Sequence, residues 1–458
     1  MESAGLRHSS QEPEKPPIWE TAGRTPPRFT VDLSVAPEHR YDHIAAQLMP
    51  AIRATDLEGL FGDLVATAVP GGWRAGQRGL LALARLTLRR VYADDETAEL
   101  RGIASATGLP LYLLVAFNVL LDLLLGCTSG GVRMAKSRIV HFRTLDWDMD
   151  ELRHLIVELD FVRAAGGPVV ATTVGYFGYV GALTGVRRGL SLSLNFRPTH
   201  DRSTWRKRAA YRWHQAMVLL GRRPSISSTL RHYLLSPAAP GTEPLLRRRD
   251  GRAEDPTVAA VASVSPLALG GEKLDTPNAE LENLHEQQDP HDLNIDSLLA
   301  ELTLSPSTAA YLIFSTAQRT YAVEKDHLAA VVRSDGTLLT TCNHDVDDES
   351  APERVAAAAA AVAETGMMSL VEDSMDRKHM VRRHEVEKQE EEKERRVPPP
   401  ADGVLLDDVL KMLGHEYITH DQTHYSVIMD PLTGRVLWRR AYDLGELGSD
   451  NSGSERDG

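Results

Sequence analysis

Residues 126–146 read Gly-Cys-Thr-Ser-Gly-Gly-Val-Arg-Met-Ala-Lys-Ser-Arg-Ile-Val-His-Phe-Arg-Thr-Leu-Asp. An apolar helical run over 111–125 ends where this stretch begins, and the pattern then changes to that of a β-hairpin. One predicted arm covers 128–134, and residues 135–137 form the turn. The second arm, 138–145, is rich in β-branched and aromatic residues, which favour strands.

The predicted hairpin gathers reactive groups at one end of a sheet. Antiparallel pairing about the turn places Cys127 opposite positions 143–146. The guanidinium of Arg143 and the carboxylate of Asp146 are therefore expected near the thiol. Because these two residues differ in strand parity, one must lie past the strand end or at a bulge if both face Cys127.

Two short blocks carry a family resemblance. Cys127-Thr128-Ser129 and the later Phe142-Arg143-Thr144-Leu145-Asp146 resemble the acid ceramidase and N-acylethanolamine-hydrolysing acid amidase family of N-terminal-nucleophile hydrolases. That family begins its catalytic chain with Cys-Thr-Ser and continues with a Gly-Arg-Asn-hydrophobe-Asp strand. The resemblance implies an α+β fold, an αββα sandwich with a helical N-terminal subunit. The sequence by itself indicates only mixed α and β structure with antiparallel hairpins.

The chemistry of a thiol explains what such a site requires. A thiol attacks best as thiolate, so it needs a base or a lowered pKa. An N-terminal cysteine carries its own base, the α-amine, whose ordinary pKa lies near neutrality. Cys127 lies in mid-chain, and the resemblance implies that the chain cuts its own Gly126–Cys127 bond to release this amine. A buried cysteine after a helix is the commoner role of a lone cysteine, but the surrounding block favours the nucleophile.

The resemblance also implies which residues assist Cys127. It implies that Asp146 holds the freed α-amine and that Arg143 organises the thiol and the carboxylate electrostatically. Cys342-Asn343-His344-Asp345 is similar to the family's Asn-Tyr-Asp region, and an asparagine amide at a strand end can stabilise the oxyanion of acyl transfer. Glu353-Arg354 resembles an acidic-arginine pair, which makes Arg354 a further catalytic candidate. A solvated arginine at a helix start is the alternative interpretation of Arg354.

The glycine-rich stretch 175–186 is similar to the family's Gly-Tyr-Val-Gly-x-Leu-Thr-Gly element. Tyr176 and Tyr179 are predicted substrate-binding residues that line an acyl channel. A glycine-rich turn with aromatic packing between strands explains the same pattern equally well. After the next strand the chain reads Asn195-Phe196-Arg197 where the family has Asn-Glu-Arg, so a role for that glutamate is in doubt here.

Composition restricts the remaining function classes. The chain has 458 residues, of which 42% are hydrophobic, and a net charge of −13, which argues against a general nucleic-acid binder. There are two cysteines, so no structural disulfide remains if one is the nucleophile. We find no apolar signal core in the first residues and no membrane-spanning run. These observations favour an intracellular soluble protein over a lysosomal or secreted one.

The predicted organisation has four parts. A disordered tail covers 1–26, a helical N-terminal subunit covers 27–126, the catalytic region covers 127–445, and a polar tail covers 446–458. The catalytic region contains two polar insertions, about 237–304 and 371–400, that are predicted to be disordered. The first is largely aperiodic, and the charged run in the second is typical of an exposed helix or a disordered arm.

Ceramide is the favoured substrate by resemblance, cleaved to a sphingoid base and a free fatty acid. An N-acylethanolamine cleaved by the same mechanism is the first alternative, and a non-catalytic lipid-binding relative is the second. The expected partners are the lipid amide, the two fragments of the chain's own cleavage and a transient membrane surface, without nucleic acid. No metal or other cofactor is implied. His415, His420 and His424 fit no zinc spacing.

Overall fold

The structure is a computed structural model that describes residues 21–68, 73–120, 126–134, 138–236, 294–361, 368–394 and 405–447. The chain divides into two units, one formed by 1–235 with 306–458 and the other by 236–305. In the described part of the second unit, Ile295–Leu304 form helix α10, which Asn294 caps by accepting a hydrogen bond from the Ser297 N–H. All other elements below belong to the first unit.

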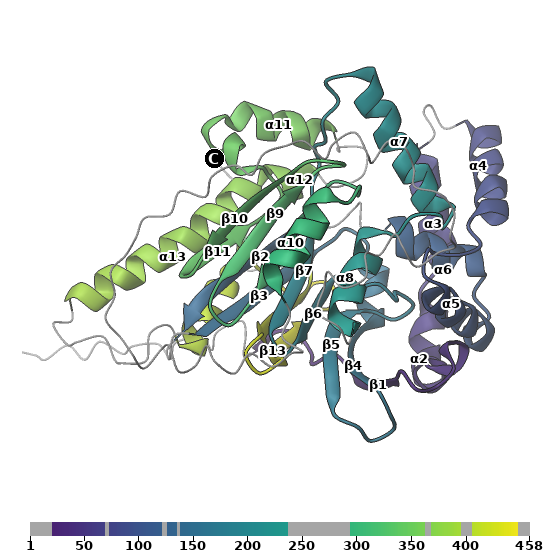
Figure 1. The fold of residues 1–458 in the computed structure, drawn as a ribbon, viewed down its shortest axis with the longest axis horizontal. Helices are drawn as coiled ribbons and strands as arrows, with labels where there is room; N and C mark the ends of the chain where they lie inside the picture. The colour runs from purple at the N-terminus through teal and green to yellow at the C-terminus, as the bar shows by residue number, and fades with distance from the viewer. Residues whose placement is uncertain are drawn as a thin grey trace, which may run out of the picture. The chain divides into compact units, whose positions relative to one another are not determined.

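Two β-sheets form the centre of the first unit (Figure 1). The larger sheet has the strand order β1-β4-β5-β6-β7-β8-β9-β10, and the smaller has the order β11-β2-β3-β12-β13. Only β1 and β4 pair in parallel among the described strand pairs. The strands are β1 (Arg28–Asp32), β2 (Gly126–Met134), β3 (Arg138–Asp146), β4 (Ile156–Val162), β5 (Val169–Tyr176), β6 (Thr184–Arg187), β7 (Leu190–Phe196), β8 (Ala310–Ser315), β9 (Thr320–Lys325), β10 (Ala330–Asp335), β11 (Leu338–Thr341), β12 (Thr423–Asp430) and β13 (Arg435–Ala441).

The two sheets face each other and carry helices on their far sides. Strands β2 and β3 contact β7 and β8 across the interface, while α8 (Ile226–Leu235) packs on β5, β6 and β7. On the smaller sheet, apolar side chains of β2, β3 and β12 form one core with α13 (Ser374–Glu394) and α14 (Leu406–Leu413). This α-β-β-α layering confirms the fold class expected from the sequence.

Helices also dominate the region before Cys127. They are η1 (Pro37–His39), α2 (Asp42–Ala54), α3 (Leu57–Ala68), α4 (Arg74–Thr87), α5 (Asp94–Thr107) and α6 (Leu111–Leu120). The later helices are η5 (Asp150–Leu155), α7 (Trp205–Leu219), η7 (Val346–Ser350), α11 (Pro352–Ala361) and α12 (Met368–Glu372). None of the described helices combines the length and the apolar character that crossing a bilayer requires.

A buried ion cluster joins the N-terminal helices to the rest of the unit. Glu99 on α5 is fully buried, and its carboxylate accepts hydrogen bonds from Arg40 at 2.9 Å and from Arg231 on α8 at 2.5 and 2.7 Å. Both guanidinium groups are themselves buried. The cluster therefore links residues on both sides of the Gly126–Cys127 bond.

We expect Glu99→Ala to lower the free energy of unfolding by about 3–5 kcal/mol, because it leaves two buried cations without their shared carboxylate. Urea unfolding, with Cys127→Ala as the common background of both variants, measures the change. Glu387→Ala is the control, since Glu387 pairs with Arg383 where both side chains are more than half exposed, and it should cost under about 1 kcal/mol. If both variants lose the same free energy of unfolding, burial of the Glu99 ion cluster does not explain its contribution to stability.

Two of the predicted disordered segments contain helices. Helix α10 lies inside the predicted insertion 237–304. Its buried side chains are Leu298, Leu299 and Leu302. Within 371–400 the chain forms the end of α12 and the whole of α13. The rest of both insertions lies outside the described residues. The N-terminal boundary is also corrected, because Arg24 exchanges two backbone hydrogen bonds with Ala441 of β13.

Candidate active site

The β2–β3 hairpin has the predicted register. Gly126 pairs with Asp146, Cys127 with Leu145 and Ser129 with Arg143. Cys127 is fully buried and faces the larger sheet, where its Sγ lies 3.7 Å from the Leu194 carbonyl oxygen. The Arg143 guanidinium donates to this sulfur at 3.0 Å and to the Leu183 carbonyl at 2.6 Å. The predicted approach of Arg143 to Cys127 is therefore present.

Asp146 lies on the opposite face of the smaller sheet, as its strand parity requires. Its carboxylate accepts a hydrogen bond from Thr423 at 2.8 Å and forms a buried ion pair with Arg377 of α13 at 3.1 Å. His420 Nε2 lies 3.9 Å from the same carboxylate. The thiol and the carboxylate thus share one end of the sheet and point to different layers.

Asn343 connects the two faces. It follows the end of β11, and its side-chain oxygen accepts from the backbone N–H of Cys127 at 3.0 Å and from Arg377 at 2.9 Å. Its amide nitrogen donates to the Phe196 carbonyl at 2.8 Å. A continuous chain of contacts therefore runs from Asp146 through Arg377 and Asn343 to the backbone nitrogen of Cys127, which is the nitrogen of the Gly126–Cys127 peptide bond.

Arg377 is the central residue of the site that sequence reasoning missed. Its guanidinium also donates to Thr128 at 3.2 Å, and its side chain is 1% exposed. It lies on a buried stripe of α13 formed by Ser374, Arg377, Lys378 and Val381. The i, i+3, i+4, i+7 spacing marks this face, but three of its four members are polar, so a search for apolar periodicity does not find it.

Arg354 does not join this cluster. It lies near the start of α11 with a side chain that is 65% exposed, and it pairs with Asp348 at 3.3 Å. The structure therefore matches the alternative interpretation, a solvated arginine at a helix start. The guanidinium near Asn343 comes instead from Arg377.

The electrostatic surroundings of Cys127 disfavour the thiolate in the uncut chain. Burial raises the pKa of the thiol from 9.0 to about 11, and the Asp146 carboxylate contributes to the same direction. The guanidinium groups of Arg143 and Arg377 oppose this shift and favour the thiolate. Since the net shift is upward, attack by Cys127 at neutral pH requires a nearby group that accepts its proton.

Tyr176 and Tyr179 contact residues that line an apolar pocket and are not themselves among its described lining residues. Both side chains are buried, and each packs edge-on against Phe117 of α6. The Tyr176 hydroxyl also bonds with Nδ1 of the buried His424 at 2.8 Å. Phe117 and Trp147 line the pocket and contact these tyrosines edge-on, and the substrate-binding role of Tyr176 and Tyr179 stays a prediction.

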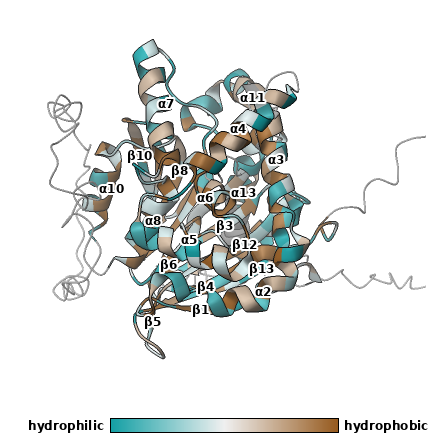
Figure 2. Cartoon of the chain, turned by 90° about the vertical axis from the view of Figure 1, so that its right-hand side faces the viewer, coloured by the Kyte–Doolittle hydropathy of each residue, from teal (hydrophilic) through white to brown (hydrophobic). Residues whose placement is uncertain are grey.

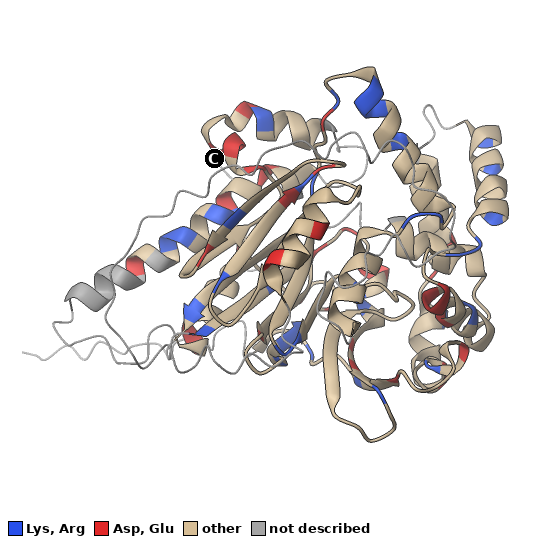
Figure 3. Ribbon diagram, viewed as in Figure 1, with Lys and Arg blue, Asp and Glu red and all other residues tan. Residues whose placement is uncertain are grey.

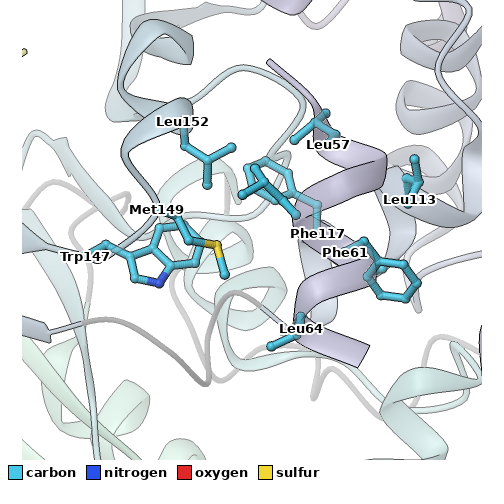
Figure 4. A pocket seen from close by; sticks show the side chains of 10 residues that line it. Leu57, Phe61, Leu64, Leu113, Phe117, Trp147, Met149 and Leu152 are labelled. Carbon is cyan, nitrogen blue, oxygen red and sulfur yellow. The ribbon is translucent and has the colours of Figure 1, made fainter. Parts of the chain in front are cut away.

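The pocket itself is built from α3, α6 and the segment after β3 (Figure 4). Trp147 directly follows Asp146, so the pocket reaches the end of strand β3. Nearly all of the lining is aliphatic or aromatic, which suits a hydrocarbon chain. The lining residues are Leu57, Leu60, Phe61, Leu64, Leu113, Ala116, Phe117, Trp147, Met149 and Leu152.

Phe196 retains a backbone role in the site. Its side chain is buried and its carbonyl oxygen receives the amide hydrogen of Asn343. The preceding Asn195 accepts a hydrogen bond from Ser129 at 2.7 Å and donates to the Thr341 carbonyl at 3.0 Å. The loss of a glutamate side chain at position 196 therefore leaves the backbone support of Asn343 in place.

The sequence is similar to one family model and to several known proteins. The family model described as the beta subunit of N-acylethanolamine-hydrolyzing acid amidase matches residues 24–76. Acid ceramidase of Mus musculus is 34% identical over 200 residues, covering 40% of this chain and 48% of that protein. N-acylethanolamine-hydrolyzing acid amidase of Caenorhabditis elegans is 29% identical over 193 residues, covering 40% of this chain and 51% of that protein.

Among the similar solved structures is that of the Caenorhabditis elegans N-acylethanolamine-hydrolyzing acid amidase ortholog. It aligns with a TM-score of 0.40 at 17% identity, covering 67% of this chain and 93% of that chain. The chain spans about half the length of the curated relatives it matches.

Proposed function

We propose that the chain is a member of the acid ceramidase and N-acylethanolamine-hydrolyzing acid amidase family and that it hydrolyses lipid amides with Cys127 as an N-terminal nucleophile. The observation that carries the proposal is the contact chain Asp146–Arg377–Asn343–Cys127, together with Arg143 on the sulfur. These groups surround both the thiol and the nitrogen that self-cleavage would release.

Self-cleavage is the first step of the proposed mechanism. The thiol gives up its proton, Sγ bonds to the Gly126 carbonyl carbon, and the bond to the Cys127 nitrogen breaks as that nitrogen takes a proton. Water then hydrolyses the thioester, which leaves a carboxylate on Gly126 and a free thiol and α-amine on Cys127. Gly126 favours this attack because it has no side chain to obstruct the approaching sulfur.

Each residue then has a role in amide hydrolysis. The α-amine accepts the proton of the Cys127 thiol and passes it to the leaving amine, while Sγ forms a thioester with the acyl group. Arg143 favours the thiolate through its 3.0 Å contact with the sulfur. Asp146 and Arg377 hold Asn343, whose amide group we assign to the oxyanion. Water hydrolyses the thioester and releases the fatty acid.

The apolar pocket supports a lipid as the substrate. It is lined by Phe117 and Trp147 and begins one residue after Asp146, so an acyl chain lying in it would place its amide near the end of β3. We favour ceramide over N-acylethanolamine because several of the relatives are named acid ceramidases. N-acylethanolamine is the alternative head group.

The proposal is tested by determining the ends of the purified chain and its products together. Mass spectrometry and N-terminal sequencing should find fragments 1–126 and 127–458. Fatty acid should then be released from a ceramide and N-acylethanolamine panel, fastest from ceramide. Hydrolysis by a chain that remains uncut would overturn the N-terminal nucleophile. Cleavage with lipid binding and no hydrolysis would favour the non-catalytic relative, which Phe196 in place of a glutamate motivates.

A further inference from the structure

A polar cluster that the mechanism above does not use contacts Asn343. Ser374 is the first residue of α13, and His344 directly follows Asn343 in the chain. Ser374 is fully buried, and His344 is 4% exposed. His344 also stands where the family's Asn-Tyr-Asp region has a tyrosine, so the cluster is not part of the pattern that carries the resemblance. These two side chains therefore need an explanation of their own.

The buried start of α13 is unusual because it is polar. Helices α4 and α7 carry both hydrophilic and hydrophobic residues along their length (Figure 2), which is typical of helices that bury an apolar stripe. Figure 3 shows basic and acidic residues along α13, and its first turns bury Ser374, Arg377 and Lys378. A buried polar side chain destabilises a fold unless it has hydrogen-bonded or charged partners. The contacts of these residues therefore indicate what this face of the helix does.

Ser374 joins the backbone of Asn343 to the ring of His344. The Asn343 N–H donates to the Ser374 hydroxyl oxygen at 2.6 Å, and the same hydroxyl lies 2.7 Å from Nδ1 of His344. Because this oxygen accepts from Asn343, its own hydrogen can be donated to Nδ1. A neutral imidazole accepts on one nitrogen only, so its proton lies on Nε2, 3.8 Å from the Glu349 carboxylate.

Helix α13 contacts Asn343 at both of its ends. Ser374 accepts from the backbone N–H, and Arg377 donates to the side-chain oxygen at 2.9 Å. These two helical residues are three positions apart and therefore lie on one face of α13. The same side-chain oxygen accepts from the backbone N–H of Cys127 at 3.0 Å. A shift of Asn343 away from Ser374 would therefore move the amide that contacts the nitrogen of the scissile bond.

The charged groups near His344 come from three segments. They are Lys378, Arg377 and Arg382 of α13, Glu349 of η7, and Asp345 next to His344 in the chain. Burial and the Lys378 ammonium lower the pKa of His344 from 6.5 to about 4, and Arg377 acts in the same direction. The carboxylates of Glu349 and Asp345 oppose this shift. The imidazole is therefore neutral at neutral pH, which is the form that accepts a hydrogen bond on Nδ1.

We propose that Ser374 and His344 are positioning residues that hold Asn343 beside the nitrogen of the scissile bond, and that this hold requires a neutral imidazole. Their part in cleavage rests on the proposed function. Without the Ser374 hydroxyl, the backbone of Asn343 loses the partner that fixes it to α13. A proton on Nδ1 of His344 removes the acceptor of that hydroxyl, so the hold weakens as the pH falls through the pKa of the ring.

Amide hydrogen exchange tests the hold without any need for cleavage. The full Cys127→Ala chain is compared with a chain that also carries Ser374→Ala, and mass spectrometry with electron-transfer fragmentation resolves the Asn343 N–H. We expect this N–H to exchange about tenfold faster or more in the second chain, because the hydrogen bond that protects it is lost. Unchanged exchange would overturn the proposal.

Ser191→Ala is the matched control. The Ser191 hydroxyl lies 3.1 Å from Nδ1 of His141, and both side chains are fully buried. The control therefore removes a buried serine hydroxyl from a buried imidazole that no hydrogen bond joins to Asn343 among the described residues. Exchange at Asn343 should stay at the parent rate. Faster exchange in the control as well would assign the effect to general loosening of the fold and contradict the proposal.

Self-cleavage tests the positioning role. In chains with Cys127 intact, Ser374→Ala and His344→Leu should each slow cleavage about tenfold or more at neutral pH, since a displaced positioning group lowers the rate steeply. Ser374→Thr keeps a hydroxyl and should recover most of the rate, and Ser191→Ala should cut at the parent rate. Each rate is divided by the folded fraction measured by circular dichroism. Parent-like cleavage in Ser374→Ala would show that the pair only stabilises the fold.

The pH profile tests the requirement for a neutral ring. His344→Asn keeps an acceptor near the position of Nδ1 and does not titrate. The hold of the parent chain is present above the pKa of His344 and is lost as the pH falls through about 4. At that pH about half of the rings are protonated, so the ratio of parent to variant rate should be about twofold lower than at neutral pH. Identical acid limbs in both chains would overturn this requirement.

Failure of the proposed function gives a different result. If the parent chain is never cut but Ser374→Ala speeds exchange at Asn343, self-cleavage is wrong and the hold on Asn343 stands. If the parent chain is cut and Ser374→Ala changes neither exchange nor cleavage, the proposed function stands and this inference is wrong.

Discussion

A Cys127→Ala chain should remain a single polypeptide of 458 residues and release no fatty acid from a lipid amide. The substitution removes the sulfur that attacks the Gly126 carbonyl, so neither the α-amine nor the thioester can form. We expect the hydrolysis rate to fall by about 10⁴-fold or more, as it does when an enzyme loses its nucleophile. A denaturing gel and fatty acid release measure the two effects separately.

Cys342→Ala is the matched control for this experiment. Cys342 is fully buried like Cys127, and burial also raises the pKa of its thiol. Its Sγ contacts the Thr128 hydroxyl at 3.7 Å, on the face of the sheet away from the Cys127 sulfur. The Cys342→Ala chain should therefore still be cut. If both variants are cut, Cys127 is not the nucleophile. If neither is cut, loss of packing at this end of the sheet explains both results, and the assignment of the nucleophile to Cys127 is contradicted.

The part of the site that the sequence predicts is local. Cys127, Arg143 and Asp146 lie in one hairpin, and the turn length and alternating pattern determine its register. The parity argument also holds, since Arg143 contacts the sulfur while Asp146 points to the opposite layer. Asn343 required the family pattern, because its partner Cys127 is 216 residues away in the chain.

The remaining contacts depend on tertiary packing that local patterns do not encode. The charged run that includes α13 suggests an exposed helix or a disordered arm. In the structure, the first turns of α13 carry buried side chains that pack against strands β2 and β11. In the same way, Tyr176 and Tyr179 have the residue type of a channel wall, but the local pattern does not show that both rings pack edge-on against Phe117 of α6. The family resemblance placed the second arginine at 354 and could not reveal that a later helix inserts Arg377.

Arg377→Met should stop self-cleavage, or slow it by about 10²-fold or more, while Arg354→Ala should leave it unchanged. Arg377 donates to Asp146, Thr128 and Asn343 from a side chain that is 1% exposed. Its loss leaves Asp146 as a buried carboxylate without its ion-pair partner, which costs about 3–5 kcal/mol of stability. Asn343 also loses the donor that holds its oxygen beside the Cys127 nitrogen. Time courses of cleavage and urea unfolding measure both effects.

Two further variants distinguish a positioning role from a purely structural one. Arg377→Met combined with Asp146→Asn removes both charges, so it should recover most of the lost stability, since a buried pair replaced as a whole costs little. Cleavage should not recover, because neither residue then orients Asn343. Arg377→Lys restores a positive charge but not the planar fork that reaches Thr128, Asp146 and Asn343 together. If the stable double variant cuts itself at the parent rate, Arg377 only stabilises the fold, and the nitrogen of Cys127 is positioned by other groups.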